Sequence, residues 1–426
     1  EYLRLMVAAL RHRGPDGENF FESLPDTRGN GVHFAHRRLS ILDLSNAASQ
    51  PMTDAVSGHH TMVFNGEIYN YVELRERLQA QGQSFSSSGD TEVALRHLTI
   101  GGDRAAADLR GMFAFALWNG ASQQIILARD PMGIKPLYIC RNPDKSDDRE
   151  WSLLFASELR AILASGLLKS PRLNPAAIAC FVWNGFVPGP STIVEGIDLL
   201  PAGQAVTLDL SGREQSNETL WRMPGADTPR ASSVEEVRAA LHQSVRLHLA
   251  SDVPLGVFLS GGIDSSAVAN MARKATTSEI STFTLAFDEH EYDESPFARE
   301  IAKAIGSRHV EVRFTEQHFL ASLDQALDSI DQPTFDGLNS FYISQAVRDA
   351  GIKVALVGTG GDELFGGYKS FRELPRLQAI TAWLAWLPKT ARVGMARAVA
   401  RLADRSQGSI GGQMRWSKLP SMVANA

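Results

Sequence analysis

The first 170 residues show two patterns of apolar positions, one typical of helices and one typical of strands. Segments rich in turn residues separate the stretches that carry these patterns. Residues 71–82 carry apolar side chains three and four positions apart, which predicts an amphipathic helix, and residues 1–11 predict another. Short apolar runs at 62–64, 112–119 and 124–129 predict strands. Strands interleaved with helices indicate an α+β layered domain.

From residue 254 onward, short apolar runs alternate with amphipathic helical segments. Strands are expected at 257–259, 282–287, 310–314 and 354–357, with helices between them. This order predicts an α/β domain with a doubly wound parallel sheet, whose ligands bind at the carboxyl ends of the strands. Residues 212–233 are polar and rich in Pro and Gly, and they are expected to form a linker.

Composition narrows the class of protein. A length of 426 residues favours two domains over one. The net charge of −6 gives no reason to expect nucleic-acid binding, and no apolar run is long enough for a membrane span. The two cysteines, Cys140 and Cys180, make no disulfide framework or zinc spacing, so a cytoplasmic location is expected.

The sequence S-G-G-I-D-S-S at residues 260–266 joins an expected strand to an expected helix. Gly261 and Gly262 let backbone N–H groups converge without a Cβ, and the helix start adds a partial positive charge. This combination binds phosphate groups. It is not the Walker type, because the chain has no Gly-x-x-x-x-Gly-Lys-Ser/Thr. A tight turn without a ligand is the alternative.

A second glycine-rich segment, G-T-G-G-D-E-L-F-G-G-Y, spans residues 358–368 after the last expected strand. Asp362 and Glu363 offer carboxylate oxygens, the ligands that Mg²⁺ prefers. The alternative is an acidic, solvated turn.

Residues 260–265 resemble the PP-loop of the ATP pyrophosphatases, and V-P-L-G-V-F-L before them narrows the resemblance to asparagine synthetases. Residues 358–368 resemble that family's second signature. The resemblance implies ATP and Mg²⁺, with Asp264 and Asp362 as catalytic, metal-binding residues. The ATP-binding positions that it implies are Leu259, Ser260, Gly261, Gly262, Asp264, Ser265, Ser266, Leu285, Val357 and Gly358.

Five motifs in the first half, H-R-G-P-D-G, H-R-R-L-S-I, F-N-G-E-I-Y-N, D-T-E and G-I-K-P-L-Y, resemble in this order a class II glutamine amidotransferase domain. That domain is an αββα sandwich of the N-terminal nucleophile (Ntn) type. The resemblance implies that Arg38 and Asp90 hold the α-carboxylate and α-amine of glutamine. It assigns Asn65 and Gly66 to a catalytic oxyanion hole, with Glu67 beside them. An Arg guanidinium pairs with a carboxylate through two hydrogen bonds, and an Asn amide and a Gly N–H can donate to an oxyanion.

In that family the nucleophile is an N-terminal cysteine, which these 426 residues lack, and Cys140 and Cys180 are expected to be structural. We therefore expect no glutaminase activity from the chain as given, which resembles a family member truncated at both ends. The expected domains are a glutaminase domain at 1–170 without its nucleophile segment, a junction and linker at 171–230, and a C-terminally incomplete synthetase domain at 231–426.

The resemblance implies an enzyme that activates aspartate as an acyl-AMP, with release of pyrophosphate, and aminates it with ammonia from glutamine. Thr359 stands where many asparagine synthetases carry an acidic residue, so another carboxylate, in polysaccharide or natural-product biosynthesis, is the alternative acceptor. A macrolactam-forming cyclase and a non-catalytic nucleotide-binding relative are further alternatives. The partners are small molecules, and whether the chain forms a homodimer stays open.

Overall fold

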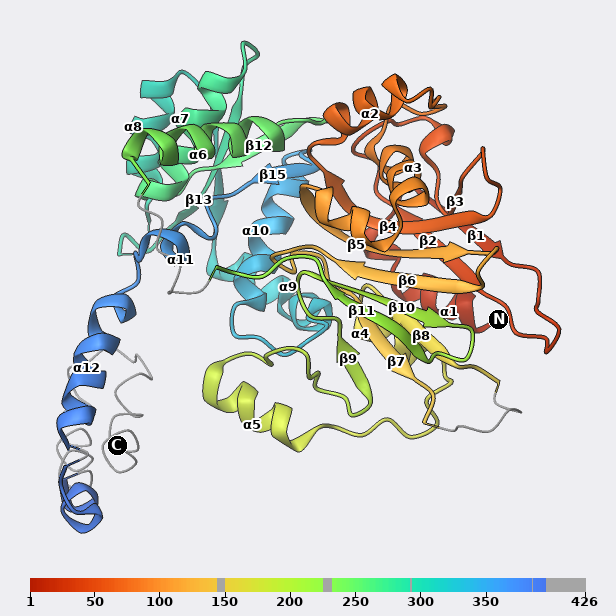
Figure 1. Ribbon diagram of the computed structural model, residues 1–426. Helices are drawn as coiled ribbons and strands as arrows, with labels where there is room; N and C mark the ends of the chain where they lie inside the picture. The colour runs from red at the N-terminus through yellow and green to blue at the C-terminus, as the bar shows by residue number, and fades with distance from the viewer. Residues whose placement is uncertain (144–149, 225–231, 292, 385, 396–426) are drawn as a thin grey trace. The chain divides into compact units, whose positions relative to one another are not determined.

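The computed structural model describes residues 1–426 apart from 144–149, 225–231, 292, 385 and 396–426 (Figure 1). The chain forms two compact units, Glu1–Val357 and Gly358–Ala426.

A six-stranded antiparallel sheet lies at the centre of the N-terminal half of the first unit. Its strand order is β11-β10-β6-β5-β4-β3. The strands are β3 (Met52–Thr53), β4 (His60–Ile68), β5 (Gly111–Asn119), β6 (Gln124–Arg129), β10 (Gln204–Asp209) and β11 (Glu214–Thr219). Helices α2 (Tyr71–Ala80) and α3 (Asp90–Gly101) cover one face of this sheet.

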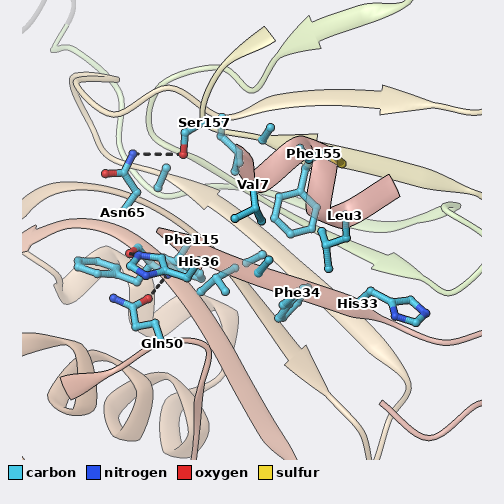
Figure 2. A pocket seen from close by; sticks show the side chains of 18 of the residues that line it. Leu3, Val7, His33, Phe34, His36, Gln50, Asn65, Phe115, Phe155 and Ser157 are labelled. Carbon is cyan, nitrogen blue, oxygen red and sulfur yellow. Dashed lines mark hydrogen bonds between the residues drawn. The ribbon is translucent and has the colours of Figure 1, made fainter. Parts of the chain in front are cut away.

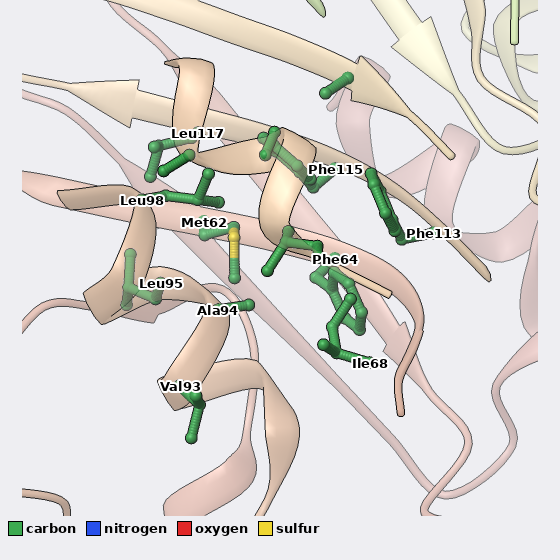
Figure 3. Close-up of a cluster of buried hydrophobic side chains, with 14 of the residues drawn as sticks. Met62, Phe64, Ile68, Val93, Ala94, Leu95, Leu98, Phe113, Phe115 and Leu117 are labelled. Carbon is green, nitrogen blue, oxygen red and sulfur yellow. The ribbon is translucent and has the colours of Figure 1, made fainter. Parts of the chain in front are cut away.

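Side chains alternate between the two faces of β4 and β5, and each face buries a separate core. Met62, Phe64, Phe113 and Phe115 pack beneath α2 and α3 (Figure 3). On the other face, Val63, Ala114 and Ala116 pack against a second sheet layer. That layer consists of two small antiparallel sheets, β1 (Gly17–Glu22) with β2 (His33–Arg38), and β8 (Leu153–Ala156), β7 (Tyr138–Arg141) and β9 (Ile197–Leu199).

Helices α1 (Tyr2–Ala9) and α4 (Leu159–Ala164) close the outer side of the second layer, around Met6, Tyr138 and Ile162. The layers therefore run helix, sheet, sheet, helix, which confirms the predicted αββα sandwich. β10 and β11 come from the segment expected to be junction and linker, so residues 204–219 complete the first sheet.

The C-terminal half of the first unit holds a parallel sheet in the order β14-β13-β12-β15. The strands are β12 (Leu255–Phe258), β13 (Ser281–Phe287), β14 (Arg308–Phe314) and β15 (Val354–Leu356). The helices of this half are α6 (Val234–His248), α7 (Ile263–Ala275), α8 (Ser295–Ile305), α9 (Glu316–Ser329) and α10 (Gly337–Asp349), whereas α5 (Pro175–Asn184) lies between β8 and β9 in the chain. The predicted parallel α/β sheet is confirmed. The strand order reverses at β12 and β15, and open α/β sheets bind ligands beside such a reversal.

One expectation about local structure was wrong. The segment 212–233 was expected to be a linker, but β11 lies within it and pairs with β10. Residues 225–231 lie outside the described part. After them, Ser233 begins α6 with a capping box, in which its hydroxyl accepts from the Glu236 N–H while the Glu236 carboxylate accepts from the Ser233 N–H.

The second unit begins with a short helix, α11 (Gly361–Phe365), and continues into α12 (Ser370–Leu384). Pro375 lies inside α12. The acidic motif of the second glycine-rich segment therefore forms the first turn of α11.

Candidate functional site

A cavity of about 990 Å³ lies between the two sheet layers of the sandwich (Figure 2). Among the described residues, β2 pairs only with β1 and β8 only with β7, so the second layer is interrupted between β2 and β8. Phe34 of β2 and Phe155 of β8 meet edge to face, with ring centroids 5.7 Å apart. Leu3 and Val7 of α1 also line the cavity.

All five residues predicted to bind glutamine line this one cavity. They come from three separate elements: Arg38 ends β2, Asn65, Gly66 and Glu67 lie in β4, and Asp90 begins α3. The fold therefore brings together residues that are more than fifty positions apart in the sequence.

The Arg38 guanidinium is held in place by the loop that follows β2. Its Nη1 donates to the Ser45 carbonyl at 2.8 Å, and its Nη2 donates to the Asp43 carbonyl. Both acceptors are neutral, so they fix the orientation of the fork without neutralising its charge. The guanidinium can therefore still attract an anionic group such as an α-carboxylate.

Asn65 and Gly66 occupy the part of β4 that faces β5. The Asn65 Nδ2 donates to the Ser157 Oγ at 3.4 Å. A Cβ on Gly66 would lie 2.2 Å from the Met112 carbonyl oxygen, so strand packing alone requires glycine there. An oxyanion-hole role for Gly66 stays a prediction.

Glu67 and Asp90 form a buried acidic pair at the cavity. The pKa of Glu67 is raised to about 7, chiefly by burial and in smaller part by the charge of Asp90, while Lys135 opposes the shift. Burial likewise raises the pKa of Asp90 to about 6, although the Ile68 N–H donates to its carboxylate at 2.8 Å. Two carboxylates with raised pKa values and no ion-pair partner among the described residues suit a cationic ligand group, which would favour their ionised forms.

The sequence did not reveal His36 and Gln50, which hold the strand that carries Asn65. β3 pairs with β4 only as far as Met62, so the open edge of β4 at Phe64 needs other partners. The Phe64 N–H donates to the Gln50 Oε1 at 2.6 Å, and the His36 ring contacts the Phe64 carbonyl at 3.2 Å (Figure 2). Burial lowers the pKa of His36 to about 4, which keeps the ring neutral.

Neither cysteine has the properties of a nucleophile at this cavity. Cys140 is buried in β7, and burial raises the pKa of its thiol to about 11. Cys180 lies in α5, and neither residue lines the cavity. These findings agree with the structural role expected for both.

The predicted phosphate loop turns from β12 into α7. Gly261 has a φ of +84°, and a Cβ there would lie 2.7 Å from the Phe297 Cβ. Both the backbone conformation and the lack of space therefore require glycine at this position. The Ser260 and Ser265 hydroxyls lie 3.0 Å apart, and the Ser266 hydroxyl donates to the Gly262 carbonyl.

Gly262 begins α7 without a side-chain cap, so the first N–H groups of the helix keep their capacity to bind an anion. Asp264 lies in this first turn, Leu259 is buried at the end of β12, and Leu285 lies in the neighbouring strand β13. Val357 follows β15, which pairs with β12.

Gly358 and Asp362 belong to the second compact unit, whereas Asp264 belongs to the first. Two residues after the end of α11, a Cβ on Gly367 would lie 1.8 Å from the Asp362 Oδ1, so this glycine makes room for the carboxylate. The Tyr368 hydroxyl donates to Glu363 at 2.8 Å. No group of three His, Cys, Asp or Glu side chains placed to hold a metal occurs among the described residues. Any cation at Asp264 or Asp362 would therefore need oxygens from a ligand such as phosphate.

Comparison with known families matches both halves. The model described as glutamine amidotransferase domain matches residues 1–221, and the model described as asparagine synthase matches residues 236–422. The two matches define a glutamine amidotransferase joined to a synthase domain. The chain belongs to the glutamine-hydrolysing asparagine synthetase family.

Two asparagine synthetases agree with this assignment. Asparagine synthetase [glutamine-hydrolyzing] 1 of Bacillus subtilis is 34% identical over 88% of this chain, which spans 56% of that relative's length. Putative asparagine synthetase [glutamine-hydrolyzing] 2 of Methanocaldococcus jannaschii is 32% identical over 92% of this chain and 76% of its own length. The solved allosteric regulatory enzyme of purine biosynthesis is 13% identical over 84% of this chain and 86% of that chain, with a TM-score of 0.39.

Within the described residues, none of the helices is both long enough and apolar enough to cross a membrane.

Proposed function

We propose that this chain carries the glutamine site and the ATP site of a two-site amidotransferase. Glutamine binds in the cavity of the sandwich, and its side-chain amide supplies ammonia to the second site. There ATP activates a carboxylate as an acyl-AMP, pyrophosphate leaves, and ammonia displaces AMP. Aspartate is the proposed acceptor, in keeping with the family to which the chain belongs.

One observation carries the glutamine part of this proposal. A single cavity presents the Arg38 guanidinium and the carboxyl groups of Glu67 and Asp90. These charges are complementary to the α-carboxylate and α-ammonium of a free amino acid. The Asn65 amide lies in the same cavity and would donate to the oxygen on which negative charge develops during amide cleavage.

The nucleophile would enter the same cavity. We propose that a strand carrying a cysteine fills the interruption between β2 and β8, where each strand has an edge without a sheet partner among the described residues. The apolar side chains of Phe34, Val63 and Phe155 line this space and suit a strand with one apolar face.

The ATP part of the proposal rests on the turn between β12 and α7. The uncapped N–H groups at the start of α7 would bind the phosphates, and Leu259 and Leu285 would lie near the nucleoside. Asp264 would bind Mg²⁺ together with phosphate oxygens, and that ion would neutralise charge on the departing pyrophosphate. Asp362, in the second compact unit, is proposed separately as a metal ligand.

The test is release of AMP and pyrophosphate from Mg-ATP, with aspartate as acceptor and ammonium as nitrogen donor. Glutamine should replace ammonium only when a segment that carries the nucleophilic cysteine is also present. The proposal predicts release that requires aspartate and a nitrogen source. If another carboxylate supports release where aspartate does not, the acceptor is wrong, and Thr359 is the first residue to examine. If ATP binds without release under every condition, the chain is a non-catalytic relative.

A further inference from the structure

The residues that hold glutamine in the proposed function share one buried support, Asp43. Its carboxylate accepts the Ser45 N–H at 3.0 Å, the Ser45 hydroxyl at 2.6 Å and the Ser88 N–H at 2.7 Å. Ser45 lies in the loop whose carbonyls hold Arg38, and Ser88 lies two residues before Asp90. Asp43 therefore fixes both the Arg38 loop and the turn that leads to Asp90.

Asp43 is itself in an unfavourable backbone conformation. Its φ is +51°, a region that residues other than glycine adopt rarely and at a cost. The residue as a whole is 7% exposed. Such a conformation persists only where neighbouring groups impose it. The hydrogen-bond partners of the Asp43 backbone therefore determine the position of its carboxylate.

The partner of the Asp43 backbone comes from the other half of the unit. The Asp43 N–H donates to the Asp252 Oδ2 at 2.8 Å, and the Asp252 N–H donates to the Ile41 carbonyl at 3.0 Å. Asp252 thus joins the loop at two points through one residue. The His248 ring lies 3.9 Å from the Tyr69 ring, centroid to centroid, so a second contact supports the same junction.

Asp252 lies three residues before β12, the strand that leads directly into the phosphate loop at Ser260. A short path of covalent and hydrogen bonds therefore runs from Arg38 through Asp43 and Asp252 to β12. We propose that Asp252 is a positioning residue, which holds the glutamine-binding side chains in place and links glutamine binding to occupation of the phosphate loop. This inference rests on the proposed function of the cavity.

The test compares Asp252→Ala and Asp252→Asn with the unaltered chain by titration calorimetry of L-glutamine, with and without saturating Mg-ATP. Asp252→Ala should weaken glutamine binding about tenfold, because the Asp43 N–H loses a charged acceptor. Asp252→Asn keeps an acceptor oxygen but loses its charge, and it should weaken glutamine binding about threefold, which exceeds the twofold limit set for the control. Mg-ATP binding in the absence of glutamine should stay within about twofold.

Gln332→Ala is the matched control, because the Gln332 Oε1 also accepts a backbone N–H from the N-terminal half, that of Ile193 at 3.0 Å. This contact touches neither Arg38 nor Asp90. Gln332→Ala should leave glutamine binding unchanged within about twofold. Thermal unfolding followed by circular dichroism shows that each variant is folded, and if Asp252→Ala does not fold, Asp252→Asn alone decides.

The link predicts that Mg-ATP changes the glutamine dissociation constant of the unaltered chain and that glutamine changes that of Mg-ATP by the same factor. Asp252→Ala should abolish this factor. Unchanged glutamine affinity in both Asp252 variants, or an equal loss in Gln332→Ala, would overturn the positioning role. Equal affinity with and without Mg-ATP in the unaltered chain would overturn the link. Absence of glutamine binding to the unaltered chain would instead reject the proposed function.

Discussion

At the scale of the residue, the acidic pair determines how glutamine binding should respond to pH. Glu67 has a pKa of about 7 and Asp90 one of about 6 in the empty cavity, and the α-ammonium of glutamine requires their ionised forms. Lowering the pH from 8 to 6 should therefore weaken glutamine binding by roughly tenfold or more. Calorimetry across this range measures the effect.

Stability of the empty protein should change in the opposite direction. The folded state raises the pKa of Glu67 from 4.5 to about 7, so it holds a proton that the unfolded chain releases. Glu67 therefore lowers the free energy of unfolding as the pH rises from about 4.5 to about 7, and it adds no further slope above that range. Glu67→Gln should remove this slope and move the midpoint of glutamine binding toward the pKa of Asp90. An unchanged binding profile in this variant would show that Glu67 is not involved.

Gly66 should tolerate no side chain. Gly66→Ala places a Cβ 2.2 Å from the Met112 carbonyl oxygen at the centre of the sheet, and it should lower the free energy of unfolding by about 3 kcal/mol. Gly17→Ala is the control, because the nearest atom to a Cβ there is 3.9 Å away, in another strand. Urea unfolding measures both, and similar losses in the two variants would contradict the packing argument.

The cavity residues differ in how visible they are in the sequence. Arg38, Asn65, Gly66, Glu67 and Asp90 stand in motifs whose order was sufficient to predict a shared site. The roles of Gln50 and His36 were not predictable, although His36 stands in the same motif as Arg38, because these roles depend on where β3 stops pairing with β4. That boundary is a property of the folded sheet, and the local sequence carries no signal for it.

At the scale of the element, the start of α7 tests the phosphate loop. Gly261→Ala should weaken Mg-ATP binding about tenfold or more, because it combines a strained φ with a contact at 2.7 Å to Phe297 and so moves the N–H groups of the turn. Fluorescence titration with a labelled ATP measures the change.

Gly351→Ala is the matched control for Gly261→Ala. Gly351 has a φ of +79°, but a Cβ there would meet nothing within 4 Å. It should cost about 1 kcal/mol of stability and leave ATP binding unchanged. Equal effects of the two variants on ATP binding would indicate a general loss of stability.

The strands show where hydrophobic pattern is informative. β5 and β6 bury apolar side chains and were predicted close to their observed ends. β4 was predicted only over residues 62–64, whereas the strand extends from His60 to Ile68. β11 reads Glu-Gln-Ser-Asn-Glu-Thr, buries none of its side chains and lies at the edge of its sheet. Its backbone pairing with β10 is the only reason it is a strand, and a polar sequence cannot reveal that.

At the scale of the whole molecule, glutamine binding and glutamine hydrolysis should be separable. Residues 1–426 contain the five cavity residues and no cysteine at the cavity, so this chain should bind glutamine and release no glutamate. Glutamate release, measured with a coupled dehydrogenase assay, should appear when an N-terminal segment with a leading cysteine is added. The same segment with alanine in place of cysteine is the control. Hydrolysis by residues 1–426 alone would contradict the proposal.

The position of β10 has a consequence for the order in which the polypeptide acquires structure as it leaves the ribosome. β6 is complete at Arg129, yet the strand that covers its free edge begins only at Gln204. During the intervening synthesis β6 is the exposed border of a half-built sheet, a surface to which other nascent chains can add. A chain released at residue 170 would keep that border permanently, so expression of 1–170 should give aggregates where expression of 1–221 gives a dispersed protein.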